Sequence, residues 1–222
     1  MLHLLPSTKK QSRMILKDTP SFSIQDYPFP RLNPQRLKMM ECTHANMDNL
    51  LPVWRRYKGP FWESLEFWVL PPPVQKRLAE RSVVMSPLLG LVHIDTPIPY
   101  APIGWKDVCN GKRVGELWRS YIRELTKEIF SDQVVFSFLG REEEKLVDLS
   151  KAKLVVRFIY RKKGRVVTNS QPHRAFTLRY IEEKNLSPDH LEKINFYDYR
   201  VTHKELRDNV LTVILESEGR YI

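Results

Sequence analysis

The chain has 222 residues, of which 42% are hydrophobic and 11% aromatic, so it can bury a core as one large domain or two small ones. Lys and Arg number 36 against 26 Asp and Glu, and the net charge of +10 favours an anionic partner: nucleic acid, a phosphorylated ligand or an anionic membrane surface. A solvated basic surface without such a partner is the alternative. No apolar run reaches the ~18 residues of a membrane span, and the short apolar start does not resemble a signal peptide.

The two cysteines, Cys42 and Cys109, lie far apart in the sequence and form no C-x-x-C pair. Zinc sites and redox motifs built from cysteine use closely spaced pairs. The sequence therefore predicts neither a disulfide framework nor a cysteine zinc site, and it fits a reducing cytoplasm.

The chain opens with a short apolar strand, Met1 to Leu5, and Lys9 follows shortly after it. A cation just past the carboxyl end of a strand is well placed to bind a ligand in an α/β protein, although a surface lysine would look the same. Several prolines between residues 18 and 36 predict an irregular segment or a lid rather than a helix.

Two helices are expected between residues 46 and 70, as a helical hairpin inserted into the fold. The first runs from Asn46 to Tyr57 and the second from Phe61 to Trp68, and a Lys-Gly-Pro turn joins them. The pair resembles a helix-hairpin-helix, whose turn can offer backbone N–H groups to a DNA phosphate. The cations near this turn are Arg55, Arg56 and Lys58. Any helical pair joined by a glycine has the same pattern.

A polar, proline-rich stretch from Ser86 to Tyr100 follows a predicted helix over residues 74–81 and an apolar strand over 83–85. An ordered loop after a buried strand is a common place for function. His93 and Asp95, two residues apart, are interpreted either as a base with its orienting group or as a satisfied pair in a loop.

The second half of the chain alternates helices and strands. Helical spacing predicts a helix over 114–130, and a buried-type strand over 133–139 leads into a short helix at 141–144, whose acids suit a helix N-terminus. Residues 153–160 and 165–168 form a predicted β-hairpin whose tip carries Lys162 and Lys163. A helix over 173–183, a helix start at 187–189 and strands over 196–201 and 209–216 complete an α/β protein.

No standard catalytic motif is present: the chain has no P-loop, G-x-S-x-G, H-E-x-x-H or G-x-G-x-x-G. The six histidines show no metal-ligand spacing, so neither a metal nor a cofactor is expected. Cations near element ends are the unusual feature: Lys9, Lys162, Lys163, Arg174 and Arg179. Together they would form a positive cleft for phosphate, whereas the arginines could instead pair with surface acids.

Four segments, in order, resemble motifs of the YaaA-type peroxide stress proteins. The opening M-L-H-L-L-P-S-T-K lines up with M-L-I-L-[IV]-S-P-A-K and places Lys9 on the family lysine. The stretch 86–100 resembles S-G-L-Y-G-[VL]-L-[RK]-P-x-D…P-Y. Residues 139–143 resemble L-A-S-x-E-Y, with Glu143 on the glutamate, and 173–180 resemble A-R-G-x-M-x-R-[FY]. The chain departs from the family at Ala101, where the family has arginine, and at Ala175, where it has glycine.

The resemblance implies one mixed α+β domain over residues 1–222, with a central mixed sheet flanked by helices, called a cantaloupe fold. It also implies a helix-hairpin-helix, a basic cleft and DNA binding. The first hypothesis is thus a cytoplasmic DNA-binding protein of the peroxide stress response. We predict that Lys9, Ser86, Glu143, Arg174 and Arg179 line one cleft, whose wall also includes Gly90 and Tyr100.

The second hypothesis is an enzyme acting on a nucleotide or another phosphorylated small molecule in the same cleft. Ser86, Asp95 and Glu143 would supply its polar or acid–base groups. A third hypothesis makes the aromatic-rich segment 54–68 a surface for a protein partner.

Overall fold

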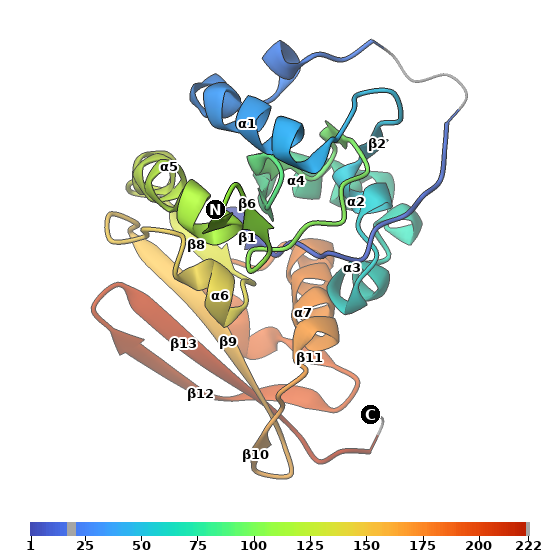
Figure 1. The fold of residues 1–222 in the computed structure, drawn as a ribbon. Helices are drawn as coiled ribbons and strands as arrows, with labels where there is room; N and C mark the ends of the chain where they lie inside the picture. The colour runs from blue at the N-terminus through green and yellow to red at the C-terminus, as the bar shows by residue number, and fades with distance from the viewer. Residues whose placement is uncertain (17–20, 221–222) are drawn as a thin grey trace.

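A central mixed β-sheet organises the chain in the computed structural model, which describes residues 1–16 and 21–220 (Figure 1). Its strand order is β11-β12-β13-β9-β8-β1-β3-β4, and β10 pairs with β9. The strands are β1 (Leu2–Leu5), β3 (Ser82–Ser86), β4 (Gly90–His93), β8 (Val134–Ser137), β9 (Leu154–Lys162), β10 (Arg165–Val166), β11 (Asn195–Phe196), β12 (Tyr199–Arg207) and β13 (Val210–Ser217).

Strand direction divides the sheet into a parallel centre and antiparallel edges. β1 runs parallel to β3 and β8, β8 parallel to β9, and β9 parallel to β13. The central strands have near-continuous apolar sequences and are largely buried, which is typical of parallel strands covered on both faces. β4 and β12 run antiparallel to their neighbours, and much of β12 is exposed. The carboxyl ends of β1, β3 and β8 therefore lie along the same edge of the sheet.

Seven helices and two small sheets surround the central sheet in the described part of the chain. The helices are α1 (Asn33–Thr43), α2 (Val53–Arg56), α3 (Pro60–Leu65), α4 (Pro72–Arg81), α5 (Val114–Ile129), α6 (Arg141–Glu144) and α7 (Gln171–Lys184), with 3-10 turns at Ile24–Asp26, Pro30–Leu32, Phe67–Val69 and Pro188–Lys193. The small sheets pair β2 (Leu51–Pro52) with β5 (Pro97–Ile98) and β6 (Val108–Cys109) with β7 (Lys112–Arg113).

Helices cover both faces of the sheet. Tyr160 of β9 shares a hydrogen bond with Thr177 of α7, whereas Arg157 of the same strand pairs with Glu144 of α6. Because residues 157 and 160 point to opposite faces of a strand, α6 and α7 lie on opposite sides of the sheet. Figure 1 shows α3 beside α7, and the two helices pack against each other. The expected mixed α/β architecture is confirmed.

Most of the elements expected from periodicity are present with boundaries shifted by a few residues. The long helix expected over 114–130 is α5, the strand over 133–139 is β8, and the hairpin with a basic tip is β9–β10. The helix expected to start at 187–189 is a 3-10 turn. The cantaloupe fold, the helix-hairpin-helix and the single-domain organisation stay predictions.

The helix expected from Asn46 to Tyr57 is wrong over most of its length. Leu51 and Pro52 form β2, and only Val53–Arg56 is helical. Proline removes a backbone donor and clashes with the preceding turn, so Pro52 blocks a continuous helix and instead precedes the first turn of α2. The second helix is also shorter than expected, because α3 ends at Leu65 and a separate 3-10 turn follows.

Two elements lie where the sequence predicted irregular chain. α1 begins inside the proline-rich segment, with Pro34 in its first turn, where proline is tolerated. Gly90 begins β4 with a φ of 77°, and a Cβ atom there would lie 2.7 Å from the ring of Trp118. The stretch after Ser86 is therefore a tight hairpin that returns along the sheet before the polar loop begins.

Cys42 and Cys109 form a disulfide, with their Cα atoms 6.0 Å apart. The expectation of no disulfide is wrong, because α1 and β6 bring together two residues that are separated by 67 positions in the sequence. Spacing rules for cysteine detect local pairs, and this pair is made by the tertiary fold. Within residues 1–16 and 21–220, no helix combines the length and the apolar character that crossing a bilayer requires.

Candidate functional site

The best-defined polar site lies where the loops after β1 and β8 diverge. From β1 the chain passes to β3 on one side, and it later returns to β8 on the other side of β1. Such a topological switch point opens a crevice at the carboxyl edge of a parallel sheet, and ligands of α/β proteins commonly bind there. The loop after β1 supplies Ser7 and Lys9 to this point, and the loop after β8 supplies Gly140 and Glu143.

Glu143 joins three segments at this switch point. Its Oε1 accepts hydrogen bonds from the Ser7 amide (2.8 Å), the Ser7 hydroxyl (2.6 Å) and Nε1 of Trp105 (3.1 Å). Its Oε2 accepts from the Gly140 amide at 3.2 Å. Burial raises the pKa of Glu143, while the hydrogen bonds from Ser7, Gly140 and Trp105 act in the opposite direction. A buried carboxyl group with a raised pKa, bound to a partly exposed hydroxyl, is a chemically suitable proton acceptor.

The loop that carries Trp105 closes over the β1 loop. Trp105 Nε1 also lies 2.9 Å from the Ser7 hydroxyl. Two residues further on, Asp107 forms an ion pair with Lys9 at 2.8 Å. Hydrogen bonds from Lys9 and from the Gly104 amide lower the pKa of Asp107. Lys9 thus stands at the entrance of the switch point, with most of its side chain exposed.

A second buried hydroxyl pair lies behind Glu143. Tyr57 is 2% exposed, and burial raises its pKa, with a hydrogen bond to Ser86 lowering it and the charge of Glu143 raising it further. Both side chains line a narrow crevice, with no room for a water molecule, that also includes Gln11 and Ala101. Ser86 itself is 1% exposed, and its Oγ accepts from the Leu89 amide within the β3–β4 turn. Tyr57 therefore lies next to Ser86 and close enough to Glu143 for the charge of this carboxylate to affect its pKa.

Cations surround the outer side of this site. Lys106, Arg113 and Lys145 lie near the exposed carboxylate of Glu142, and hydrogen bonding by Lys145 and the charges of all three lower its pKa. Lys106 is the neighbour of Asp107 in the sequence, so these three cations continue the surface that begins at Lys9. We call Lys9, Lys106, Arg113 and Lys145 the basic rim. Its four cations face two acids, Asp107 and Glu142, so the rim has net positive charge.

The predicted cleft residues are only partly brought together. Lys9, Ser86 and Glu143 all lie at the carboxyl edge of the sheet, although Ser86 is buried and contacts neither of the other two. Arg174, at the start of α7, also reaches this edge, where its Nη1 donates to the carbonyls of Phe138 (3.3 Å) and Leu139 (2.5 Å).

Arg179 lies further along α7 and faces α3. It pairs with Glu66 at 2.6 Å and with Glu183 at 3.6 Å, as the alternative interpretation of the arginines anticipated. The prediction that Arg179 lines the same cleft as Glu143 is not supported by these contacts, because its charge is balanced between two helices.

Asp95 is not part of the same site. β4 runs antiparallel to β3 and pairs His93 with Val83, so the turn after His93 lies at the opposite edge of the sheet from Ser86. Asp95 is exposed on that turn, and His93 Nδ1 lies 3.3 Å from the carbonyl of Ser82. The proposed acid–base set of Ser86, Asp95 and Glu143 is therefore wrong for Asp95.

The cations of the predicted helix-hairpin-helix have different environments. Arg56 is fully buried and donates to the carbonyls of Ile98, Ser12 and Asn49. Burial lowers its pKa to about 10. Its assignment to phosphate binding is corrected, because its donors already serve three carbonyls in the interior.

Arg55 and Lys58 are half-buried and remain candidates for an anion. The ammonium of Lys58 lies 5.4 Å from the centre of the half-exposed Trp68 ring. The Lys58 amide donates to the carbonyl of Lys10 at 2.8 Å, and Gly59 packs against Thr8. At these residues the turn between α2 and α3 packs on the β1 loop.

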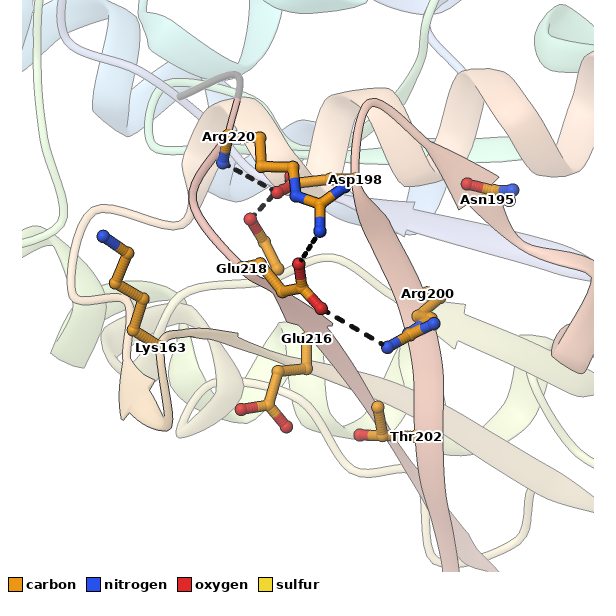
Figure 2. Close-up of a pocket in the computed structure, with 9 residues that line it drawn as sticks. Lys163, Asn195, Asp198, Arg200, Thr202, Glu216, Glu218 and Arg220 are labelled. Carbon is orange, nitrogen blue, oxygen red and sulfur yellow. Dashed lines mark hydrogen bonds and ion pairs between the residues drawn. The ribbon is translucent and has the colours of Figure 1, made fainter.

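A larger cavity lies at the far end of the sheet, near the β9–β10 tip (Figure 2). It measures about 550 Å³ and is lined by three cations, three acids and three smaller residues: Lys163, Arg200, Arg220, Asp198, Glu216, Glu218, Asn195, Thr202 and Ser217. Figure 2 shows Glu218 between Arg200 and Arg220, with ion pairs to both. Ser217 and the Arg220 amide bind Asp198. The charges of this cavity are thus largely matched by its own walls.

Lys162 and Lys163 belong to this far end rather than to the switch point. The Lys163 amide donates to the Ser217 carbonyl at 2.9 Å, and the Gly164 amide to Glu216 at 3.1 Å. β9 continues five residues beyond Arg157, the partner of the last residue of β8. At about 3.3 Å per residue, its tip lies roughly 16 Å beyond that edge. The basic hairpin therefore does not share a cleft with Lys9.

Several residues of the site escaped sequence reasoning. Ser7 was not singled out from the sequence, and Trp105, Asp107 and the rim residues Lys106 and Arg113 lie in a segment without a motif. The available signal was the position of Ser7, two residues past a central parallel strand. Across the described residues, no three His, Cys, Asp or Glu side chains gather closely enough to hold a metal ion.

Comparison with known proteins does not add an assignment. No protein-family model matches this sequence, and none of the curated proteins matches it either.

Proposed function

We propose that this protein binds DNA through the phosphate backbone, with the basic rim at the carboxyl edge of β1 and β8 as the contact surface. On this proposal it is a cytoplasmic protein of the YaaA-type peroxide stress family, which its four motifs resemble. The observation that carries the proposal is the gathering of Lys9, Lys106, Arg113 and Lys145 at one edge of a protein of net charge +10. Exposed lysine and arginine side chains bind phosphate without reading sequence.

The rim is built so that its cations stay accessible. The side chains of Lys9, Lys106 and Lys145 are 60%, 74% and 64% exposed. Their partners Asp107 and Glu142 are surface acids, and exposed ion pairs of this kind contribute little free energy. A phosphate can therefore replace a carboxylate partner at small cost, and the release of counterions from DNA favours the exchange.

The test is fluorescence anisotropy with a short labelled DNA duplex over a range of salt concentrations. Each phosphate contact contributes about 0.9 to the slope of log K against log salt, so we expect Lys106→Ala and Lys145→Ala each to lower the slope by ~1. Lys153→Ala is the matched control, because Lys153 is exposed immediately before β9, at the end of the sheet opposite to the basic rim. Absence of binding at low salt, or equal slopes for all three variants, would contradict the proposal.

A nucleotide or another phosphorylated small molecule is the second candidate ligand for the same site. It is favoured by one observation, the 2.6 Å hydrogen bond between the Ser7 hydroxyl and the buried Glu143 at the switch point. A free nucleoside triphosphate added to the anisotropy assay separates the two functions. If the nucleotide displaces the duplex at concentrations far below those at which simple salt does so, the site binds nucleotides. If it displaces the duplex no better than salt does, the nucleotide proposal is rejected.

A further inference from the structure

The Cys42–Cys109 bond attaches the basic rim to the rest of the molecule. Cys109 ends β6, immediately after the segment that carries Trp105, Lys106 and Asp107. Cys42 lies in the last turn of α1, an element remote in the sequence. These are the only two cysteines of the chain. The disulfide thus joins the loop of the candidate site to α1.

Few other contacts hold the tip of this loop. β6 and β7 are two residues long each, and so short a hairpin is marginally stable without a further anchor. Its base is held by the Val114 amide bonded to Asp107 and the Gly115 amide bonded to Trp105, both at 2.9 Å. Val108, in the hairpin itself, is 66% exposed. The disulfide is therefore the strongest constraint on the segment from 108 to 113.

The two cysteines differ in exposure. Cys42 is half-buried, whereas Cys109 is 2% exposed. A small thiol therefore reaches Cys42 more readily than the buried Cys109, and Cys42 is the expected site of attack in thiol–disulfide exchange. In a cytoplasm, as proposed for this protein, disulfides of mesophilic proteins are typically transient and redox-sensing rather than permanent.

We propose that Cys42 and Cys109 form a reversible thiol–disulfide switch that fixes the 104–113 segment when oxidised and releases it when reduced. Because Lys106 and Arg113 belong to this segment, the switch also controls how rigidly these two cations of the basic rim are held in place. That consequence rests on the proposed DNA binding, whereas the switch itself does not.

The chemistry is exchange with a small disulfide of the glutathione type. The Cys42 thiolate attacks one sulfur of the small disulfide, forming a mixed disulfide and releasing one small thiolate. The Cys109 thiolate then attacks the Cys42 sulfur, which closes the protein disulfide and releases the second small thiolate. Two electrons pass from the two cysteines to the small disulfide. In the reverse reaction, two small thiols reduce the protein disulfide through the same mixed disulfide.

Hydrogen exchange measured by mass spectrometry tests the switch on the full chain. The protein is equilibrated in oxidised or reduced glutathione, its thiols are counted by alkylation, and amide exchange is followed peptide by peptide. We expect no alkylation after oxidation and two alkylated cysteines after reduction. Amides of residues 104–113 should exchange at least tenfold faster in the reduced protein, while those of β8 and β9 stay unchanged.

Cys42→Ala is the control variant, because Cys42 is the half-buried partner and its loss leaves the buried Cys109 in place. The variant should exchange as the reduced protein does under both conditions. The reduced wild-type protein provides the same comparison without any substitution. Two thiols that alkylate after oxidation, or equal exchange of 104–113 in both states, would overturn the proposal.

DNA affinity is the second readout and keeps the two proposals separate. If the rim binds DNA, reduction should weaken binding by several-fold in the wild-type protein and leave Cys42→Ala unaffected. A protein that switches in hydrogen exchange but binds no DNA in either state would refute the proposed function alone. Binding that is identical in both states, together with unchanged exchange, would refute the switch alone.

Discussion

Buried arginine side chains in this protein bind backbone carbonyls instead of acids. Arg36 is fully buried and donates to the carbonyls of Leu89 and Leu91, so it covers the free edge of β4. Burial lowers its pKa to about 10. Arg56 and Arg174 bind carbonyls in the same way. An arginine near a predicted turn is thus as suited to holding loops as to binding phosphate, and only its burial distinguishes the two roles.

Glu143 is the residue whose loss we expect to damage the switch point most. Glu143→Ala would leave the donors of Ser7, Gly140 and Trp105 without their shared acceptor, and we expect a loss of about 2–3 kcal/mol in the free energy of unfolding. Urea denaturation measures this loss. Glu142→Ala, on the same one-turn helix but exposed, is the matched control and should change stability by less than ~0.5 kcal/mol. Equal effects of the two variants would show that the buried hydrogen bonds contribute nothing.

At the scale of elements, one buried carboxylate connects α7 to both β1 and α4. Glu182 is fully buried and lies 2.6 Å from His3 Nε2, 3.2 Å from Arg77 and 3.2 Å from Arg81. Burial alone would raise the pKa of Glu182, but the hydrogen bond and charge of His3 and the charge of Arg81 lower it overall. Breaking such a network leaves an unpaired charge in the interior, so α7 is held firmly at its carboxyl end.

His3 makes this junction sensitive to acid. Burial lowers the pKa of His3 below 6.5, against the raising effect of Glu182, and its Nδ1 is buried without a hydrogen-bond partner. Protonation would therefore place an unpaired N–H in the core. The unfolded chain binds this proton more readily than the folded chain does. The contribution of neutral His3 to the free energy of unfolding is therefore fully present above about pH 6.5 and decreases as the pH falls. Because the pKa of Glu182 is lowered in the folded protein, its contribution to the free energy of unfolding is also lost as the pH falls, but at lower pH than that of His3.

We expect His3→Gln to reduce this pH dependence, because glutamine keeps a donor for Glu182 and cannot titrate. Between pH 6.5 and 5, the unfolding free energy of the wild-type protein should fall by up to about 1.4 kcal/mol per pH unit more than that of the variant. Urea denaturation at a series of pH values gives this difference, with His44→Gln, at an exposed histidine, as the control. Parallel pH profiles for wild type and His3→Gln would contradict the assignment.

For the whole molecule, the central question is how its positive charge is distributed. The basic rim and the β9–β10 tip lie at separate places, and at the tip the acids of β13 and of the C-terminal segment accompany the cations. At the carboxyl edge of β1 and β8, by comparison, the four cations of the basic rim are accompanied by Asp107 and Glu142. The Cys42–Cys109 disulfide holds the segment that carries two of these cations, Lys106 and Arg113.

The disulfide should also contribute to global stability. Closing a loop across a sequence separation of 67 residues restricts the unfolded chain and stabilises the fold by about 4 kcal/mol in the chain-entropy description. We expect Cys42→Ala to lose about this amount relative to the oxidised wild-type protein, as measured by urea denaturation without reductant. In the presence of reductant the two proteins should unfold alike. A difference that persists in reductant would assign the effect to the side chain instead of the bond.

Local pattern determined much of the fold. The amphipathic spacing of α5, the apolar runs of β1, β3 and β8 and the basic hairpin β9–β10 were all predictable, because each depends on residues close in sequence. The positions of Lys9 and Glu143 just past central strands also indicated that both residues lie at the carboxyl edge of the sheet. The helix expected over 46–57 failed over most of its length because Pro52 interrupts it, so that only Val53–Arg56 is helical.

Long-range packing decided the rest. Only the tertiary structure brings Ser7 to Glu143, places Lys106 and Arg113 near Glu142, separates Asp95 from Ser86 and buries Arg56. It also joins Cys42 to Cys109 across the fold. The physical reason is that hydrophobic periodicity specifies which face of an element is buried, whereas strand order and loop paths specify which polar side chains become neighbours.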